Sequence, residues 1–146
     1  SGPEEPALRS LVDRLGLSEK VSFAGALFGD AKNEIWRNSD VFAFPTFHNE
    51  GLPYSLLEAM AAGAVPVTTS VGAIPDVLTD GEHGLIVRAR DQEAITGAFK
   101  RLDDDRQLLE RLSHQGRERI LSAYSVDRLA GDFRALYTDL LTPRSS

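Results

Sequence analysis

The chain has 146 residues, 42% of them hydrophobic, a formal net charge of −6 and no cysteine. It can therefore form one domain with a real core, while its negative charge without a basic run argues against nucleic acid as a partner. Disulfides and thiolate metal sites are excluded, and because no signal-like leader, lipidation motif or long apolar segment is seen, we expect a cytoplasmic protein.

The first part of the chain predicts two helices around a short strand. Residues 4–15 repeat apolar side chains at helical spacing, so we expect a helix that packs on a sheet. Residues 21–24 alternate like a strand, and Gly25 marks the turn that follows. Asp30 is a suitable cap for a second helix that reaches Asn38.

The centre of the chain reads as strand, loop, helix and strand. Residues 41–44 and 65–69 are nearly all apolar, which predicts two buried strands. Between them, Pro53 suits the first position of a helix and Gly63 the residue just past its last, so we expect a helix over residues 53–62. Its amino end then follows the carboxyl end of a strand, where unpaired N–H groups and the helix dipole favour an anion.

The remainder of the chain is mostly helical. Residues 74–78 predict a helical turn, and residues 85–87 predict a third apolar strand. Three further helices are each preceded by a capping residue: Asp91 before a helix to Leu102, Asp105 before one to about Tyr124, and Ser125 before one to Leu141, where Pro143 ends the pattern.

Apolar strands that alternate with helices predict an α/β, Rossmann-like fold, with a parallel sheet covered by helices on both faces. We expect a single domain over residues 1–146, with a C-terminal helical segment over residues 106–146. The carboxyl ends of the strands carry the sharp turns. The loops at residues 25–29, 45–52 and 70–73 should therefore gather on one rim, where such sheets bind ligands.

Two carboxylates accompany the predicted anion site: Glu50 lies in the loop before the helix, and Glu58 lies inside it. A carboxylate beside a phosphate is repulsive, so we expect each to accept hydrogen bonds from hydroxyl groups on either side of the anion, as from a sugar and a ribose. The alternative is that Glu50 only complements the helix dipole and Glu58 is a solvated helix former. The spacing alone leaves both interpretations open.

The run from Glu50 to Gly63, EGLPYSLLEAMAAG, with Val65-Pro66-Val67 after it, resembles the donor-site signature of one enzyme class. That class is the retaining, nucleotide-sugar-dependent glycosyltransferases of the group-one (family four) type. The resemblance covers nearly the whole chain, because further blocks match in order: residues 40–45, 71–76, 80–81 and 84–87.

The resemblance implies a two-domain enzyme of the B-type fold, whose carboxyl-terminal domain holds the donor, a UDP- or GDP-linked sugar. Glu50 matches the glutamate beside the donor sugar hydroxyls, and we expect it to be the catalytic residue. Glu58 matches the glutamate that binds the ribose. Donor contacts are implied at Gly51, Leu52 and Tyr54 through backbone N–H groups, whereas Pro53 has no N–H to offer. Apart from the resemblance, the hydroxyls of Tyr54 and Ser55 at the helix start are candidates for donor contacts; the alternative is that they only cap and pack the helix.

The same resemblance implies catalysis without a metal or other cofactor. The helix dipole and cations neutralise the leaving diphosphate, and the acceptor attacks from the face that the nucleotide leaves, so configuration is retained. Glu50 acting as a covalent nucleophile is the alternative. The implied role is cell-envelope polysaccharide or glycoconjugate biosynthesis, in the cytoplasm or at the inner face of the membrane. Additional candidate contacts are His48, Gly25 and Gly72, although a loop histidine is often only solvated.

Two features depart from the family pattern. Ala73 stands where the family usually has the second Gly of a pair. The family also carries two strands upstream of Ser1, with the Arg and Lys expected on the diphosphate. In a sheet with the strand order 3-2-1-4-5-6, these two upstream strands lie between the strands at residues 21–24 and 41–44, so their absence leaves a gap in the sheet. We expect the gap to be filled by the rest of a longer protein, which also contains the acceptor domain, or by a second chain. The alternative is a rearranged pairing of residues 21–24.

Two other classes of function stay open. One is a non-catalytic nucleotide- or sugar-binding module, and the other is an assembly domain whose last helices, residues 107–141, dock on a partner. Two acids beside an anion site favour an enzyme origin over both. We expect the isolated chain to be inactive, because it lacks the acceptor domain and the cations.

Overall fold

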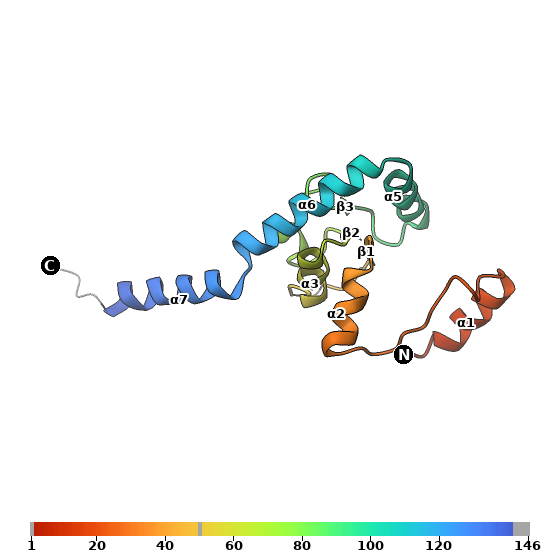
Figure 1. Cartoon of the computed structure of the whole chain (residues 1–146), viewed down its shortest axis with the longest axis horizontal. Coiled ribbons are helices and arrows are strands. Elements are labelled where there is room, and N and C mark those ends of the chain that lie inside the picture. The colour runs from red at the N-terminus through yellow and green to blue at the C-terminus, as the bar shows by residue number, and fades with distance from the viewer. Residues whose placement is uncertain (1, 50, 142–146) are drawn as a thin grey trace. The chain divides into compact units, whose positions relative to one another are not determined.

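The computed structural model describes residues 2–49 and 51–141, and Figure 1 shows the elements in chain order. The chain separates into two compact units, Ser1–Glu34 and Ile35–Ser146. Each unit is described on its own below. Whether the two act as the single domain that we expect over the whole chain stays a prediction.

The first unit contains helix α1 (Glu5–Arg14) and begins helix α2 (Gly29–Arg37). Arg9 donates hydrogen bonds of 3.0 and 2.7 Å to Glu5, and this contact lowers the pKa of the Glu5 carboxyl below its ordinary value. Helix α2 starts one residue before Asp30, so the prediction that Asp30 caps it is wrong: Asp30 lies in the first turn instead.

The strand predicted at residues 21–24 is not formed, which corrects the sequence interpretation. A strand satisfies its backbone groups only by pairing with another strand. No strand among the described residues pairs with this segment. The rearranged pairing of residues 21–24 with residues 41–44 is likewise not found in the described part of the chain.

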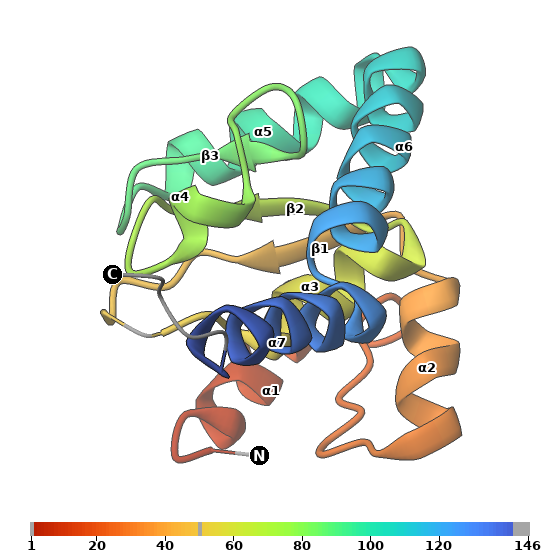
Figure 2. The ribbon, with the colours of Figure 1, turned by 90° about the vertical axis from the view of Figure 1, so that its left-hand side faces the viewer.

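The second unit is built on a parallel sheet in the order β1-β2-β3. Its strands are β1 (Val41–Phe44), β2 (Val65–Thr68) and β3 (Leu85–Ile86). Val41 is opposite Val65, and Val67 is opposite Leu85. Figure 2 shows β1 and β2 running in the same direction. The predicted parallel Rossmann-like sheet is thereby confirmed.

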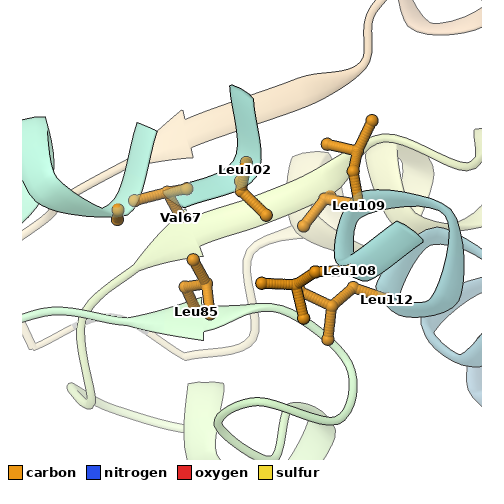
Figure 3. Packing of buried hydrophobic residues seen from close by; sticks show 8 residues of the cluster. Val67, Leu85, Leu102, Leu108, Leu109 and Leu112 are labelled. Carbon is orange, nitrogen blue, oxygen red and sulfur yellow. The ribbon is translucent and has the colours of Figure 1, made fainter. Parts of the chain in front are cut away.

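Helices cover both faces of this sheet. The helices of the second unit are α3 (Tyr54–Ala62), α4 (Ile74–Val77), α5 (Gln92–Asp104), α6 (Arg106–Ala123) and α7 (Val126–Leu141). On one face, α5 and the start of α6 enclose a buried cluster with strand residues, which Figure 3 shows: Val65, Val67, Leu85, Ala98, Leu102, Leu108, Leu109 and Leu112. On the other face, α3, α4 and the later part of α6 form a second cluster: Leu56, Met60, Ile74, Val77, Leu78 and Ile120.

The caps predicted for the last three helices are formed. Asp91 accepts a hydrogen bond of 2.9 Å from the backbone N–H of Ala94, and Asp105 accepts one of 2.9 Å from Leu108. The Ser125 hydroxyl oxygen accepts one of 3.2 Å from the N–H of Arg128. These contacts explain why α5, α6 and α7 begin where the sequence predicts. The Pro143 stop lies outside the described residues.

Strand β1 is less buried than the sequence predicts. All four residues of β2 are buried, whereas Val41, Phe42 and Phe44 are half-buried and Ala43 is exposed. The reason is position: β1 is an edge strand, and no described strand pairs with its outer edge. The indole Nε1 of Trp36, whose ring packs against Phe42, is buried without a hydrogen-bond partner among the described residues.

Helix α6 holds the carboxyl end of α3. The Ser113 hydroxyl donates to the carbonyl oxygen of Gly63 over 2.6 Å, and Arg117 donates to the carbonyl oxygen of Ala61. Gly63 has a φ of 96°, which is the left-handed conformation predicted for the residue that ends this helix. Helix α3 is therefore anchored at its carboxyl end.

Helix α7 makes little contact with the rest of the second unit, since every one of its residues is exposed. Its apolar side chains are between 50% and 81% exposed: Val126, Leu129, Phe133, Leu136, Tyr137, Leu140 and Leu141. None of the helices in residues 2–49 and 51–141 combines the length and apolar character needed to cross a membrane.

Candidate functional site

The loops after β1 and β2 lie side by side at the carboxyl ends of the strands. Two buried hydroxyls at the end of β2 hold the start of the first loop: Thr68 Oγ1 donates to the carbonyl of Phe44 over 2.8 Å, and Thr69 Oγ1 donates to that of Thr46 over 2.5 Å. The described residues of two predicted rim loops, 45–49 with 51–52 and 70–73, therefore lie at the same edge of the sheet. The third predicted rim segment, residues 25–29, belongs to the first unit.

The amino end of α3 opens onto this rim without a side-chain cap. The helix starts at Tyr54, and Pro53 is its N-cap with extended backbone, so the predicted helical first position for Pro53 is wrong by one residue. Proline offers no side-chain acceptor, and the first turn contains no acidic residue. The first N–H groups of a helix have no acceptor within the helix, so this end can bind an anion.

Glu58 lies one turn into α3 on the face that carries Tyr54 and Ser55. It follows Tyr54 by four residues, which is about 6 Å along a helix axis, and it is half-buried. Tyr54 is 81% exposed. Helical spacing thus places Tyr54, Ser55 and Glu58 on one face near the amino end of α3. Glu50, the predicted catalytic residue, lies outside the described residues.

The residues on either side of Glu50 differ in burial. Gly51 is exposed, whereas Leu52 is half-buried and packs on the cluster that contains Leu56. His48 is exposed; its backbone N–H donates to Thr46 Oγ1 over 3.2 Å, and its ring lies 4.3 Å from that of Phe47. The loop therefore has contacts on both sides of Glu50: those of His48 before it and the packing of Leu52 after it.

The two candidate glycines both have left-handed backbone. Gly72, in the loop after β2, has a φ of 57°, and Gly25, in the first unit, has a φ of 67°. Ala73, which replaces a family glycine, has a φ of −87° that any residue adopts. The Ala73 departure therefore leaves the conformation of this loop unstrained.

Sequence reasoning missed the side chains that hold the loop. Thr68 and Thr69 place two successive hydroxyl side chains at the end of a buried strand. This pattern is only a weak signal that they hold the neighbouring loop. Arg90 is different: its guanidinium lies 4.3 Å over the Phe47 ring, a contact across 43 residues that no local pattern predicts.

Arg90 also lines an open pocket of about 840 Å³ together with Arg88, Gln92, Thr96 and Lys100. This pocket contains none of the predicted donor residues. We place the candidate site at α3 nevertheless, because the uncapped helix end, the hydroxyls and Glu58 meet there. Within residues 2–49 and 51–141, no three His, Asp or Glu side chains are grouped as metal ligands, and catalysis without a metal stays a prediction.

Comparison with curated proteins finds relatives along nearly the whole chain. The chain is 31% identical over 147 residues to an exopolysaccharide phosphotransferase of Streptomyces coelicolor. This alignment covers 98% of this chain and 15% of that protein. It is 32% identical over 142 residues to a phosphatidyl-myo-inositol mannosyltransferase of Mycobacterium leprae. That alignment covers 97% of this chain and 37% of the mannosyltransferase. The chain spans 15% to 39% of the length of the first curated relatives that it matches.

The fold is shared with solved structures. Anabaena HepE in complex with UDP-glucose superposes with a TM-score of 0.80 at 17% identity, over 92% of this chain and 36% of that one. Residues 1–105 match the family described as Glycosyl transferases group 1. Because this match covers most of the chain, the chain belongs to the group 1 glycosyl transferases.

Proposed function

We propose that this chain is the donor-binding part of a retaining glycosyltransferase. The donor is a nucleoside-diphosphate sugar linked to UDP or GDP, and the acceptor is a glycan, lipid or small molecule. The observation that carries the proposal is the uncapped amino end of α3 at the rim, with Glu58 one turn into the helix. The matched family and the UDP-glucose bound by HepE support it.

In this proposal the diphosphate lies at the amino end of α3. The N–H groups of Tyr54 and its neighbours and the helix dipole stabilise the charge that develops on the leaving diphosphate. Glu58 accepts hydrogen bonds from the ribose hydroxyls. Glu50 accepts them from the donor sugar and acts at the reacting carbon, where the acceptor attacks from the face that the nucleotide leaves. No metal is required for these steps.

The remaining parts of the site come from outside this chain. Residues 41–87, which supply both rim loops, contain no Lys or Arg. The cations on the diphosphate, and a strand that pairs with the outer edge of β1, are therefore assigned to the rest of a longer protein or to a second chain. An acceptor-binding domain completes the cleft. The isolated chain should accordingly be unable to transfer sugar.

We place the full enzyme in cell-envelope polysaccharide or glycoconjugate biosynthesis, in the cytoplasm or at the inner face of the membrane. The names of the curated relatives, which include a capsular polysaccharide glycosyltransferase and a lipopolysaccharide core mannosyltransferase, support this assignment.

A Glu50→Gln variant of the full-length protein tests the enzyme assignment. Loss of the carboxylate should abolish transfer, while affinity for UDP or GDP should stay within about threefold, because the nucleotide contacts come from α3. Circular dichroism checks that the fold is kept. Full transfer by Glu50→Gln would contradict the catalytic role. Nucleotide binding without any transfer by the wild-type protein would favour a non-catalytic binding module.

An assembly domain is the second candidate function. It is favoured by α7, whose seven apolar side chains are at least half exposed. An assembly domain has no need of a nucleotide, so a full-length protein that binds neither UDP nor GDP would favour this candidate over the transferase.

A further inference from the structure

Arg90 joins the segment after β3 to the loop that leads to Glu50. Its guanidinium carbon lies 4.3 Å from the centre of the Phe47 ring, and the Phe47 and His48 rings lie 4.3 Å apart. Arg90, Phe47 and His48, three side chains from two segments, are therefore in successive contact, with the Phe47 and His48 rings tilted by 36°. The last of them, His48, precedes Glu50 by two residues.

The backbone of Arg90 is strained. Its φ is 61°, and it is the one residue other than glycine with a positive φ in the described chain. Glycine adopts this conformation without a steric penalty, whereas any residue with a Cβ is disfavoured there. An arginine side chain at such a position indicates a contact that glycine does not provide, and such outliers cluster at functional sites.

Arg90 also brings positive charge to loops that lack it, because residues 41–87 contain neither Lys nor Arg. Its neighbours in the pocket beside α5 include Arg88 and Lys100, and two carboxylates, Asp91 and Glu93. Asp91 is already engaged as the cap of α5. The contact of Arg90 with the face of Phe47 is the geometry in which a cation is attracted to an aromatic ring.

We propose that Arg90 is a positioning residue for the loop that carries Glu50. Its guanidinium holds Phe47 and Phe47 contacts His48, so these contacts fix residues 47 and 48 of the loop that carries Glu50. The Thr69 hydroxyl fixes the same loop one residue earlier, at Thr46. This inference rests on the proposed function, and Arg90 acts through Phe47 rather than by touching the donor.

A role in stability alone makes a different prediction. If Arg90 only braced the fold, its replacement would lower stability first and activity second. Arg90→Gly separates the two roles, because glycine relieves the positive φ while it removes the guanidinium. The matched control is Arg88→Ala, which removes an exposed cation from the same pocket without touching Phe47.

The test uses the full-length protein that contains this chain, with a UDP- or GDP-sugar as donor. Arg90→Gly should unfold at the wild-type temperature or above it, yet lose roughly tenfold in kcat, since small misplacement of a catalytic group has effects of this order or larger. Free UDP or GDP should bind as tightly as to the wild type, because Glu58 is undisturbed. Arg90→Lys should restore part of the lost rate, and Arg88→Ala should match the wild type.

A second variant checks that the effect passes through the ring. Phe47→Leu should lower kcat to a similar extent, and the Phe47→Leu, Arg90→Gly double variant should lose no more than either single one. Wild-type kcat in a folded Arg90→Gly would overturn the role of Arg90 and leave the proposed function intact. A wild-type protein that neither binds nucleotide nor transfers sugar would overturn the proposed function, and this inference with it.

Discussion

The hydroxyl of Ser113 on α6 donates a 2.6 Å hydrogen bond to the carbonyl oxygen of Gly63, the residue that ends α3. The two residues are separated by 50 positions. The bond satisfies a carbonyl at the carboxyl end of α3, where a helix has no partner of its own. Helix α6 thus fixes the end of α3 that lies away from the rim.

Ser113→Ala should lower the free energy of unfolding by about 1 to 2 kcal/mol, because the Gly63 carbonyl loses its partner in a half-buried place. Ser122→Ala is the control, since that exposed hydroxyl bonds only to carbonyls of its own helix. Urea unfolding measures both. Equal stability of the two variants would show that the Ser113 contact contributes nothing.

Gly84→Ala should destabilise the second unit by about 1 to 3 kcal/mol through overpacking. A Cβ at residue 84 meets Pro66 Cγ at 2.6 Å and the Pro66 carbonyl oxygen at 2.7 Å, and backbone cannot move aside easily. Gly97→Ala is the opposite case: a Cβ there meets no atom within 4 Å, and alanine favours helix α5 by roughly 1 kcal/mol. Thermal unfolding should rank Gly97→Ala first, the wild type second and Gly84→Ala last.

Thr69→Val should weaken the hold on the loop after β1. Valine keeps the shape of the side chain and removes the hydroxyl that donates to Thr46, so we expect a loss of about 1 kcal/mol in stability. Transfer by the full-length protein should fall as well, because this loop carries Glu50. Thr96→Val is the control, as its hydroxyl bonds within α5. Unchanged kcat and KM in Thr69→Val would contradict a role of Thr69 in positioning the loop that carries Glu50.

The outer edge of β1 should be poorly protected in the isolated chain. Strand β2 is paired on both sides, but β1 is paired only with β2 among the described strands. Hydrogen exchange followed by mass spectrometry should therefore be faster at residues 41–44 than at residues 65–68, and the longer protein should protect both. Equal protection of the two strands in the isolated chain would contradict the view that the outer edge of β1 lacks a partner that the longer protein supplies.

Much of the second unit was predictable because its signals are local. The bounds of β1 were predicted at both ends, and Gly63, Asp91 and Asp105 each stand where the backbone needs a left-handed residue or a cap. The alternation of apolar strands with helices predicted the parallel sheet, because strands with helices on both faces carry apolar side chains on both sides.

Two failures, at Asp30 and Pro53, are shifts of a helix start by one or two residues. The larger failures concern partners that the local sequence does not contain. Residues 21–24 have the pattern of a strand, yet they form none without a neighbour to pair with. The half-burial of β1 has the same cause. The Arg90 contact with Phe47 depends on how two distant segments meet, and a loop arginine in isolation reads as solvated.

Nucleotide binding by the full-length protein tests the central claim most directly. Titration calorimetry with UDP and GDP should give micromolar binding of one of them, and Glu58→Gln should weaken it at least tenfold, or about 1.4 kcal/mol, through the lost ribose contacts. Glu110→Gln, an exposed glutamate on α6, should bind like the wild type. Binding of neither nucleotide, or wild-type affinity in Glu58→Gln, would contradict a donor site at the amino end of α3.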